Sequence, residues 1–199
     1  MTKIAFIDDD GRTEAYTMLV PLLERFGFKG CFAVVTNRVG REGYMNKRQL
    51  FELQQRGHEI MSHSKTHPNM DNISFSEAVF EFRSSKTDLE SLGLDVGSFV
   101  FPFNQSNPVL SLEVLKMYDF GFVGKGGNGE AGDIARLGIG GRRAKGTRQW
   151  VNQANGTLFL YGHSSEWNKL TRRQVRKLFE YITKKGLTIE TVKTILKQQ

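Results

Sequence analysis

The chain has 199 residues, of which 39% are hydrophobic and 25% are charged, a composition that supports one well-packed domain and excludes wholesale disorder. Its formal net charge is +7, which favours anionic or neutral partners over cationic ones. The single cysteine, Cys31, excludes an internal disulfide. No apolar stretch approaches the ~20 residues of a membrane span, and no signal peptide is expected before the first strand.

Short apolar runs bounded by turn residues predict the strands of a sheet. They lie at residues 3–7, 31–35, 59–61, 98–103, 120–123, 134–139 and 157–161. Between them, apolar residues at helical spacing predict helices over residues 13–26, 47–56, 74–93, 108–118 and 171–186, with a short helix at the end. Asn46, Ser74 and Thr171 are the expected N-caps of three of these helices.

The regular alternation of strands and helices predicts an α/β fold with a parallel sheet and crossover helices. We expect a (β/α) barrel of seven or eight strands, and an open doubly wound sheet is the alternative. The sequence shows no internal repeat and no linker, so residues 1–199 are expected to form a single domain.

Two of the four histidines, His63 and His67, lie four residues apart directly after a predicted strand, and Pro68 follows at once. Proline disfavours a helical conformation for the preceding residue, so the pair is expected in a turn rather than on a helix. Two imidazoles on one short turn would supply two ligands of a three-ligand metal site. Taken alone, the same pair also fits a surface or capping role.

Three consecutive carboxylates, Asp8, Asp9 and Asp10, follow the first strand and precede Gly11. Carboxylates this close repel one another at a buried strand end unless a cation or several hydrogen bonds compensate. In an α/β barrel, sites are built at the C-terminal ends of the strands, where these aspartates, both motif histidines and His163 are all expected.

Taken in order, the strand-end motifs are Ile-Asp-Asp-Asp-Gly at residues 7–11, His-Ser-Lys-Thr-His-Pro at 63–68, Phe-Pro-Phe at 101–103 and Tyr-Gly-His at 161–163. This set resembles the polysaccharide deacetylases of the NodB-homology group, carbohydrate esterase family 4. Their motifs are Thr-Phe-Asp-Asp-Gly, His-Ser/Thr-x-x-His-Pro, Arg-x-Pro-Tyr and Leu-x-His. The resemblance spans nearly the whole chain and implies a NodB-like barrel.

Carried over residue by residue, the resemblance implies that Asp10, His63 and His67 bind one divalent metal ion. Zinc is the expected metal, with cobalt, nickel or manganese as alternatives. The metal would activate a water molecule as the nucleophile, with Asp9 as the catalytic base and His163 as the catalytic acid. A shift of one residue would instead make Asp8 the base and Asp9 the ligand, and the triple aspartate leaves both assignments open.

The third motif departs from the family pattern because Val100 stands where the family has an arginine that orients the base. We hypothesise that Arg136, on a later strand, replaces it; the alternative is a surface arginine on an edge strand. In the same motif, Pro102 and Phe103 are the expected substrate and oxyanion residues, with the backbone N–H of Phe103 as the donor. Tyr161 stands where the family has leucine.

The resemblance implies a hydrolase that removes N-acetyl groups from a GlcNAc-type polysaccharide or peptidoglycan. Two alternatives stay open: a non-catalytic glycan-binding or structural domain on the same scaffold, and a deacetylase or amidase acting on a non-sugar amide. The partner is an N-acetylated glycan. The protein would be cytoplasmic, or a trimmed or delivered domain that acts on the cell wall.

A run of basic residues at 142–148, followed by Trp150, could bind phosphate or an anionic glycan. No familiar nucleic-acid motif accompanies it, and we expect no nucleic-acid partner. Glycines between residues 124 and 146 lack the Gly-Lys-Ser/Thr of a phosphate-binding loop and are expected in loops beside the site.

Overall fold

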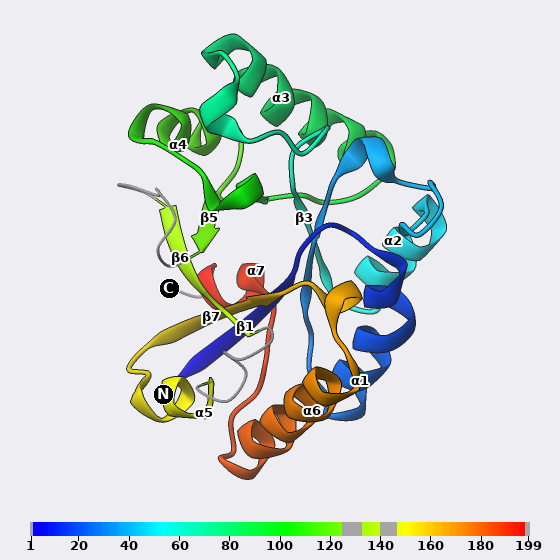
Figure 1. The fold of residues 1–199 in the computed structure, drawn as a ribbon, viewed down its shortest axis with the longest axis vertical. Coiled ribbons are helices and arrows are strands. Elements are labelled where there is room, and N and C mark those ends of the chain that lie inside the picture. Colours follow the sequence, from blue (N-terminus) through cyan, green and yellow to red (C-terminus); the bar gives the residue numbers. More distant parts are fainter. Residues whose placement is uncertain (1, 125–132, 140–146, 198–199) are drawn as a thin grey trace.

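The protein is a closed barrel of seven parallel strands in the order β1 to β7, seen in a computed structural model that describes residues 2–124, 133–139 and 147–197 (Figure 1). The strands are β1 (Lys3–Asp8), β2 (Cys31–Val34), β3 (Glu59–Ser62), β4 (Ser98–Val100), β5 (Phe120–Gly124), β6 (Asp133–Gly138) and β7 (Thr157–Gly162). Each strand pairs with the next, and β1 pairs with β7 over six residues to close the barrel. The predicted barrel is therefore confirmed, and the open sheet is excluded.

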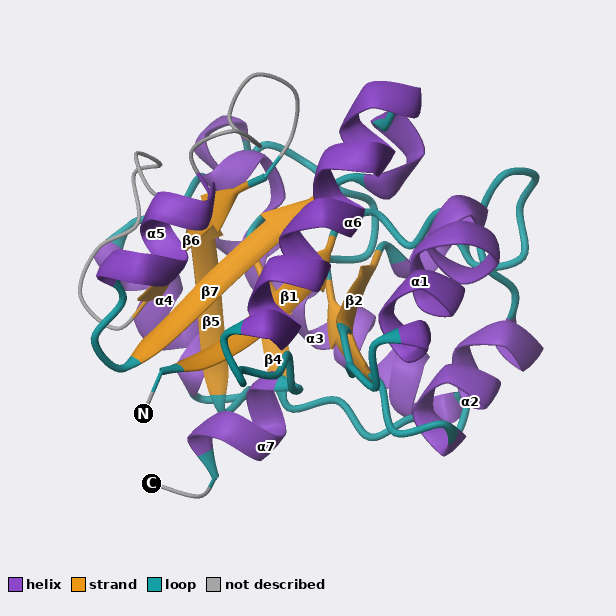
Figure 2. Cartoon of the chain, turned by 90° about the horizontal axis from the view of Figure 1, so that it is seen from below, coloured by secondary structure: helices purple, strands orange, loops and turns teal. Residues whose placement is uncertain are grey.

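The helices surround this barrel and connect its strands (Figures 1 and 2). They are α1 (Val20–Arg25), α2 (Lys47–Gln55), α3 (Phe75–Ser91), α4 (Pro108–Leu115), α5 (Thr147–Gln153), α6 (Lys169–Lys184) and α7 (Val192–Leu196). In the part of the chain that the structure describes, no helix is both long enough and apolar enough to cross a membrane.

Side-chain caps fix the starts of several helices. Asn46 and Ser74 are the N-caps of α2 and α3, as predicted, and each forms a capping box; the Asn107 side chain caps α4. The prediction of Thr171 as the cap of the last long helix is wrong. Asn168 caps α6 and accepts the N–H of Thr171, because an amide oxygen three residues earlier satisfies the first free backbone donors.

Two segments differ in part from the expected helices. The helix expected over residues 13–26 forms, but Ala15–Leu19 within it is a π-helix that precedes α1. Residues 147–153, which include the end of the predicted basic run, form α5, a helix that the sequence did not predict, and Trp150 packs against the core. The rest of the predicted basic run, at residues 142–146, and most of the predicted glycine-rich loops lie outside the described residues.

Side chains alternate between the two faces of each strand, so the core has one part inside the barrel and one part between the barrel and the helices. On β1, Ile4 and Phe6 point outward and pack against the helices, whereas Ala5 and Ile7 point into the barrel. The interior is a compact cluster of Ala5, Ile7, Cys31, Ala33, Met61, Val100, Phe122 and Phe159. Val192 and Ile195 of α7 join this cluster, so α7 closes the end of the barrel at which the strands begin (Figure 2). The opposite, C-terminal end holds the polar residues that the sequence motifs single out.

Candidate metal centre and catalytic site

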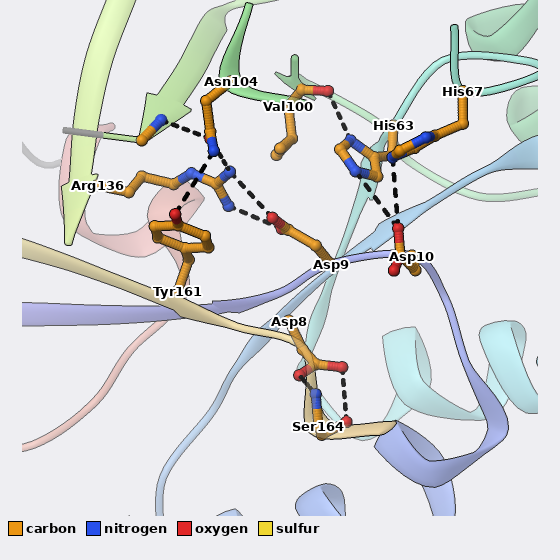
Figure 3. A network of polar contacts seen from close by, with 11 residues as sticks. Asp8, Asp9, Asp10, His63, His67, Val100, Asn104, Arg136, Tyr161 and Ser164 are labelled. Atoms are coloured by element: carbon orange, nitrogen blue, oxygen red, sulfur yellow. Dashed lines mark hydrogen bonds and ion pairs between the residues drawn. The ribbon is translucent and has the colours of Figure 1, made fainter. Parts of the chain in front are cut away.

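The polar residues singled out in the sequence follow directly after the C-terminal ends of three strands. Asp8 is the last residue of β1 and leads into Asp9 and Asp10, β3 delivers His63, and β7 delivers His163. Parallel strands of a barrel present these ends on one rim, and the rim brings together side chains that are more than 50 residues apart in the chain (Figure 3).

One group of these side chains has the donor set of a metal site. One ligand atom each from Asp10, His63 and His67 lies within 4.8 Å of the others. The Asp10 Oδ1 lies 3.7 Å from Nε2 of His63 and 3.4 Å from Nε2 of His67. Two imidazoles and one carboxylate fit a zinc-like ion and leave coordination positions for other ligands. The Asp10 side chain keeps 22% of its surface exposed, so the cluster is accessible from the rim.

The surroundings of His63 and His67 favour the neutral form of both imidazole rings. Nδ1 of His63 donates a hydrogen bond to the carbonyl oxygen of Val100 at 2.8 Å. The proton of the neutral ring is then on Nδ1, and the lone pair of Nε2 faces Asp10 (Figure 3). Burial lowers the pKa of His63, and burial together with the neighbouring His63 lowers the pKa of His67 to about 4. Both imidazoles are therefore neutral at pH 7, the form that binds metals.

Backbone strain is concentrated at this rim. Among the described residues, five non-glycine residues have a positive φ, and all five follow β1, β3 or β4: Asp10, Ser64, His67, Phe103 and Asn104. Such conformations cost roughly 1–3 kcal/mol each and persist where the surrounding structure enforces them, which is common at functional sites. Gly11, at φ +70, completes the turn after β1, and a Cβ there would lie 3.3 Å from the Cα of Val34.

Asp9 is paired with Arg136. The guanidinium donates two parallel hydrogen bonds, from Nη1 to Oδ1 at 2.7 Å and from Nη2 to Oδ2 at 3.0 Å, and both side chains are buried (Figure 3). Burial raises the pKa of Asp9, but the charge and hydrogen bonds of Arg136, together with the charges of His63 and His163, outweigh burial and hold that pKa below its usual value. Asp9 is thus an ionised carboxylate beside the cluster of Asp10, His63 and His67.

Asp8 points away from this cluster. Its two oxygens accept hydrogen bonds from the backbone N–H and the hydroxyl of Ser164, both at 2.8 Å (Figure 3). Burial raises the pKa of Asp8 well above its ordinary value, and the Ser164 bonds offset this only in part. Of the two assignments left open by the sequence, this geometry favours Asp9 and Asp10 over Asp8 and Asp9.

The remaining predicted residues border the same rim. His163 is half-buried and follows β7 at the same rim. Pro102 and Phe103 form a 3-10 turn, Pro102–Asn104, after β4, and the exposed Phe103 ring lies 4.8 Å from the His67 ring, between centroids. The structure thus brings all the predicted site residues to one end of the barrel.

Sequence reasoning missed two residues of the site. Ser164 satisfies Asp8, and Asn104 contacts Arg136, with Nη2 donating to its Oδ1 at 3.3 Å. Neither residue belongs to a motif with a recognisable spacing. The only available signal was their position, one residue after His163 and one residue after Phe103.

The sequence profile of the polysaccharide deacetylase family matches residues 2–122. The putative polysaccharide deacetylase YxkH of Bacillus subtilis (strain 168) is 24% identical over 106 residues, which are 53% of this chain and 34% of YxkH. The match thus spans about a third of that relative's length.

Solved structures share the fold. The Xyl-CE4 domain of a multidomain xylanase from the hindgut metagenome of Trinervitermes trinervoides matches with a TM-score of 0.75 at 21% identity, over 98% of this chain and 89% of that one. A family 4 acetyl xylan esterase from Clostridium thermocellum, in complex with cobalt, matches with a TM-score of 0.73 at 18% identity, over 100% and 91%.

Fold and motifs together define a carbohydrate-esterase-type (β/α) barrel with a two-histidine, one-carboxylate cluster at its rim. The chain belongs to the polysaccharide deacetylase family, as the motif resemblance implied.

Proposed function

We propose that this protein is a metal-dependent hydrolase that removes N-acetyl groups from a GlcNAc-type polysaccharide or peptidoglycan. The observation that carries the proposal is the cluster of Asp10, His63 and His67 next to the ionised Asp9–Arg136 pair. A cation site beside a buried carboxylate that stays charged is the pairing that hydrolysis of an amide needs.

Asp10, His63 and His67 would hold the ion, for which zinc is the proposed identity and cobalt, nickel or manganese are alternatives. When bound, the ion lowers the pKa of water and polarises the acetyl carbonyl. Asp9, kept ionised by Arg136, accepts the proton that the attacking water loses. His163 donates a proton to the departing sugar nitrogen, so that an amine rather than an amide anion leaves.

The oxyanion that forms from the acetyl carbonyl needs a donor from the protein. The backbone N–H of Phe103 is the proposed donor, because the turn after β4 places Phe103 beside His67. Pro102 fixes the start of that turn through its restricted φ. The exposed ring of Phe103 then offers an apolar face next to the acetyl group.

The test combines metal content with acetate release from N-acetylated chito-oligosaccharides and from peptidoglycan. We expect one divalent ion per chain, a higher Tm with added zinc, and acetate release that is lost in His63→Ala together with the bound metal. His58→Asn is the matched control, since His58 lies on the outside of the barrel at the start of β3 and should keep both metal and activity.

Other outcomes select between the alternatives. Release from acetylated xylan alone would assign an O-acetyl ester as the substrate, which is the linkage named for the structural relative from Clostridium thermocellum. Bound metal without release from any acetylated glycan would point to a non-sugar amide. Neither metal nor acetate would contradict the proposal and favour a non-catalytic glycan-binding domain.

A further inference from the structure

Arg136 reaches Asp9 from β6 and carries a charge that is completely buried. It belongs to β6, its side chain has no exposed surface, and among the described residues Asp9 is its only ion-pair partner. No acceptor among those residues is found for its Nε. A buried cation with a single carboxylate needs further favourable contacts to remain in one geometry.

Two neutral side chains supply those contacts (Figure 3). The aromatic ring of Tyr161, on β7, lies against the guanidinium with 4.3 Å between Cζ of Arg136 and the ring centroid. Asn104, in the turn after β4, accepts a hydrogen bond from Nη2 of Arg136 at 3.3 Å. Its amide also faces the hydroxyl of Tyr161 across 3.5 Å. Side chains from β4's turn, β6 and β7 therefore meet at one guanidinium.

Asn104 is itself held in place by the backbone. Its φ is +57°, a conformation that asparagine tolerates better than most side chains, and its Oδ1 accepts the N–H of Gly124 at 2.6 Å. The amide oxygen thus binds the end of β5 and the guanidinium at once. This double contact fixes where Arg136 can lie relative to the turn that carries Phe103.

Two glycines make room for these side chains. A Cβ on Gly124 would lie 2.7 Å from Cγ of Asn104, and a Cβ on Gly138 would lie 3.2 Å from the Tyr161 ring. The first distance is a clash and the second a tight contact, so larger residues at either position would displace the contacting side chain. The space around Arg136 is therefore built for Asn104 and Tyr161.

We propose that Asn104 and Tyr161 are positioning residues that hold Arg136 against Asp9. This inference rests on the proposed function, because its consequence is the orientation of the base. Val100 points into the same barrel interior as the Tyr161 ring, so an arginine can approach Asp9 from either strand. The strand that delivers it determines which neighbours must support it.

The test uses four single variants with zinc-loaded protein. Tyr161→Phe keeps the ring and removes only the hydroxyl, whereas Tyr161→Leu removes the ring. Asn104→Asp keeps the size and the acceptor for Gly124, but it places a second carboxylate on Arg136 that competes with Asp9. Tyr181→Leu is the control, because Tyr181 also contacts an arginine, Arg148, at 5.3 Å on the outside of the barrel.

We expect Tyr161→Leu and Asn104→Asp to lower kcat for acetate release by about ten- to thirty-fold, with KM, zinc content and Tm changed little. Tyr161→Phe should retain most of the activity, and Tyr181→Leu should match wild type. Unchanged kcat in both Tyr161→Leu and Asn104→Asp would overturn the proposal. Equal losses in kcat and in zinc content would also overturn it, because they would indicate a general structural role.

A measurement that needs no activity separates this proposal from the proposed function. In nitrogen-15 NMR, a clamped guanidinium has slow rotation about its Cζ–N bonds, and the Arg136 signals can be assigned by their loss in Arg136→Lys. We expect separate, slowly exchanging Nη signals in wild type and averaged signals in Tyr161→Leu. Slow exchange in Tyr161→Leu would contradict the clamp. If wild type releases no acetate but the NMR difference is present, the clamp stands and only the proposed reaction fails.

Discussion

The two ends of the barrel both bury carboxylates, yet only one has the features of a site. At the closed end, Glu59 of β3 accepts hydrogen bonds from the hydroxyl of Ser98 at 2.9 Å and from the backbone N–H of Lys193 at 2.8 Å. The thiol of Cys31 lies 3.7 Å from the same carboxylate, and α7 covers the group. No described residue there, glycine aside, has a positive φ.

At the open end, Ser164 and Arg136 donate hydrogen bonds to Asp8 and Asp9, but no such donor is found for Asp10 among the described residues, and the backbone is strained. Asp10 faces two neutral imidazoles rather than hydrogen-bond donors of its own, and its exposed side is free to meet a cation. The comparison shows that burial of a carboxylate does not by itself mark a site. What distinguishes the rim is a set of ligand atoms held close together, at a cost in backbone strain, without being satisfied by one another.

The largest expected difference lies within the rim, between two neighbouring aspartates. Asp9→Asn should lower kcat by about 10²–10⁴-fold, because an amide cannot accept the proton from water. Asp8→Asn should lower it by less than about tenfold, since burial already raises the pKa of Asp8 and its partner Ser164 is not part of the reaction. Steady-state acetate release measures both. A greater loss in Asp8→Asn would reverse the assignment of base and ligand.

At the closed end, a change should affect stability and leave chemistry intact. Glu59→Ala leaves the Ser98 hydroxyl and the Lys193 N–H without their acceptor and should lower the free energy of unfolding by about 2–5 kcal/mol. Urea unfolding measures the loss, and activity per folded molecule should equal that of wild type. Glu59→Gln is the control. Burial raises the pKa of Glu59, so a neutral amide avoids the cost of burying charge and should keep or increase stability at pH 7. A loss of turnover in folded Glu59→Gln would show that the two ends are coupled.

The smallest expected effect concerns His58, outside the barrel. Burial lowers its pKa in the folded state, and its Nδ1 accepts the N–H of Gly30 at 3.0 Å, which requires the unprotonated form. The unfolded chain therefore binds the proton more readily, and the stability that His58 contributes is present above about pH 6.5 and lost as the pH falls below it. Unfolding of metal-free protein between pH 7 and pH 5 should be less pH-dependent in His58→Asn than in wild type. Equal slopes would contradict this.

Much of the fold could be predicted because it depends on local patterns. Apolar runs located all the strands, and the expected N-caps Asn46 and Ser74 located the starts of two helices. The cap of α6 was misplaced because Asn168 and Thr171 are both good caps and only the backbone geometry selects between them. The helix α5 was missed because its charges and few apolar residues gave no clear period.

The site divides in the same way. The cluster of Asp10, His63 and His67 could be predicted from one short motif, one strand end and the family resemblance. The orientations of Asp8 and Asp9 could not, since they depend on partners more than 120 residues away, Ser164 and Arg136. Arg136 was proposed only by comparison with a motif that lacks its arginine. Asn104 and Tyr161 contact Arg136 only because the closed barrel brings β7 and the turn after β4 next to β6. No local sequence pattern predicts such contacts.

A closed barrel has a consequence for how such proteins are compared. Because every strand ends on the same ring, a functional group can migrate from one strand to another in evolution while the point it occupies in space stays the same. A chain that lacks a motif residue on one strand can therefore place the same chemical group at that point from another strand, as β6 does here in place of β4. In this protein, the feature to compare between relatives is the position of the guanidinium relative to the Asp9 carboxylate, rather than the residue type at position 100. A search for the third-motif arginine at its usual place in the sequence would miss Arg136, whereas a superposition of charged atoms would find its guanidinium beside Asp9.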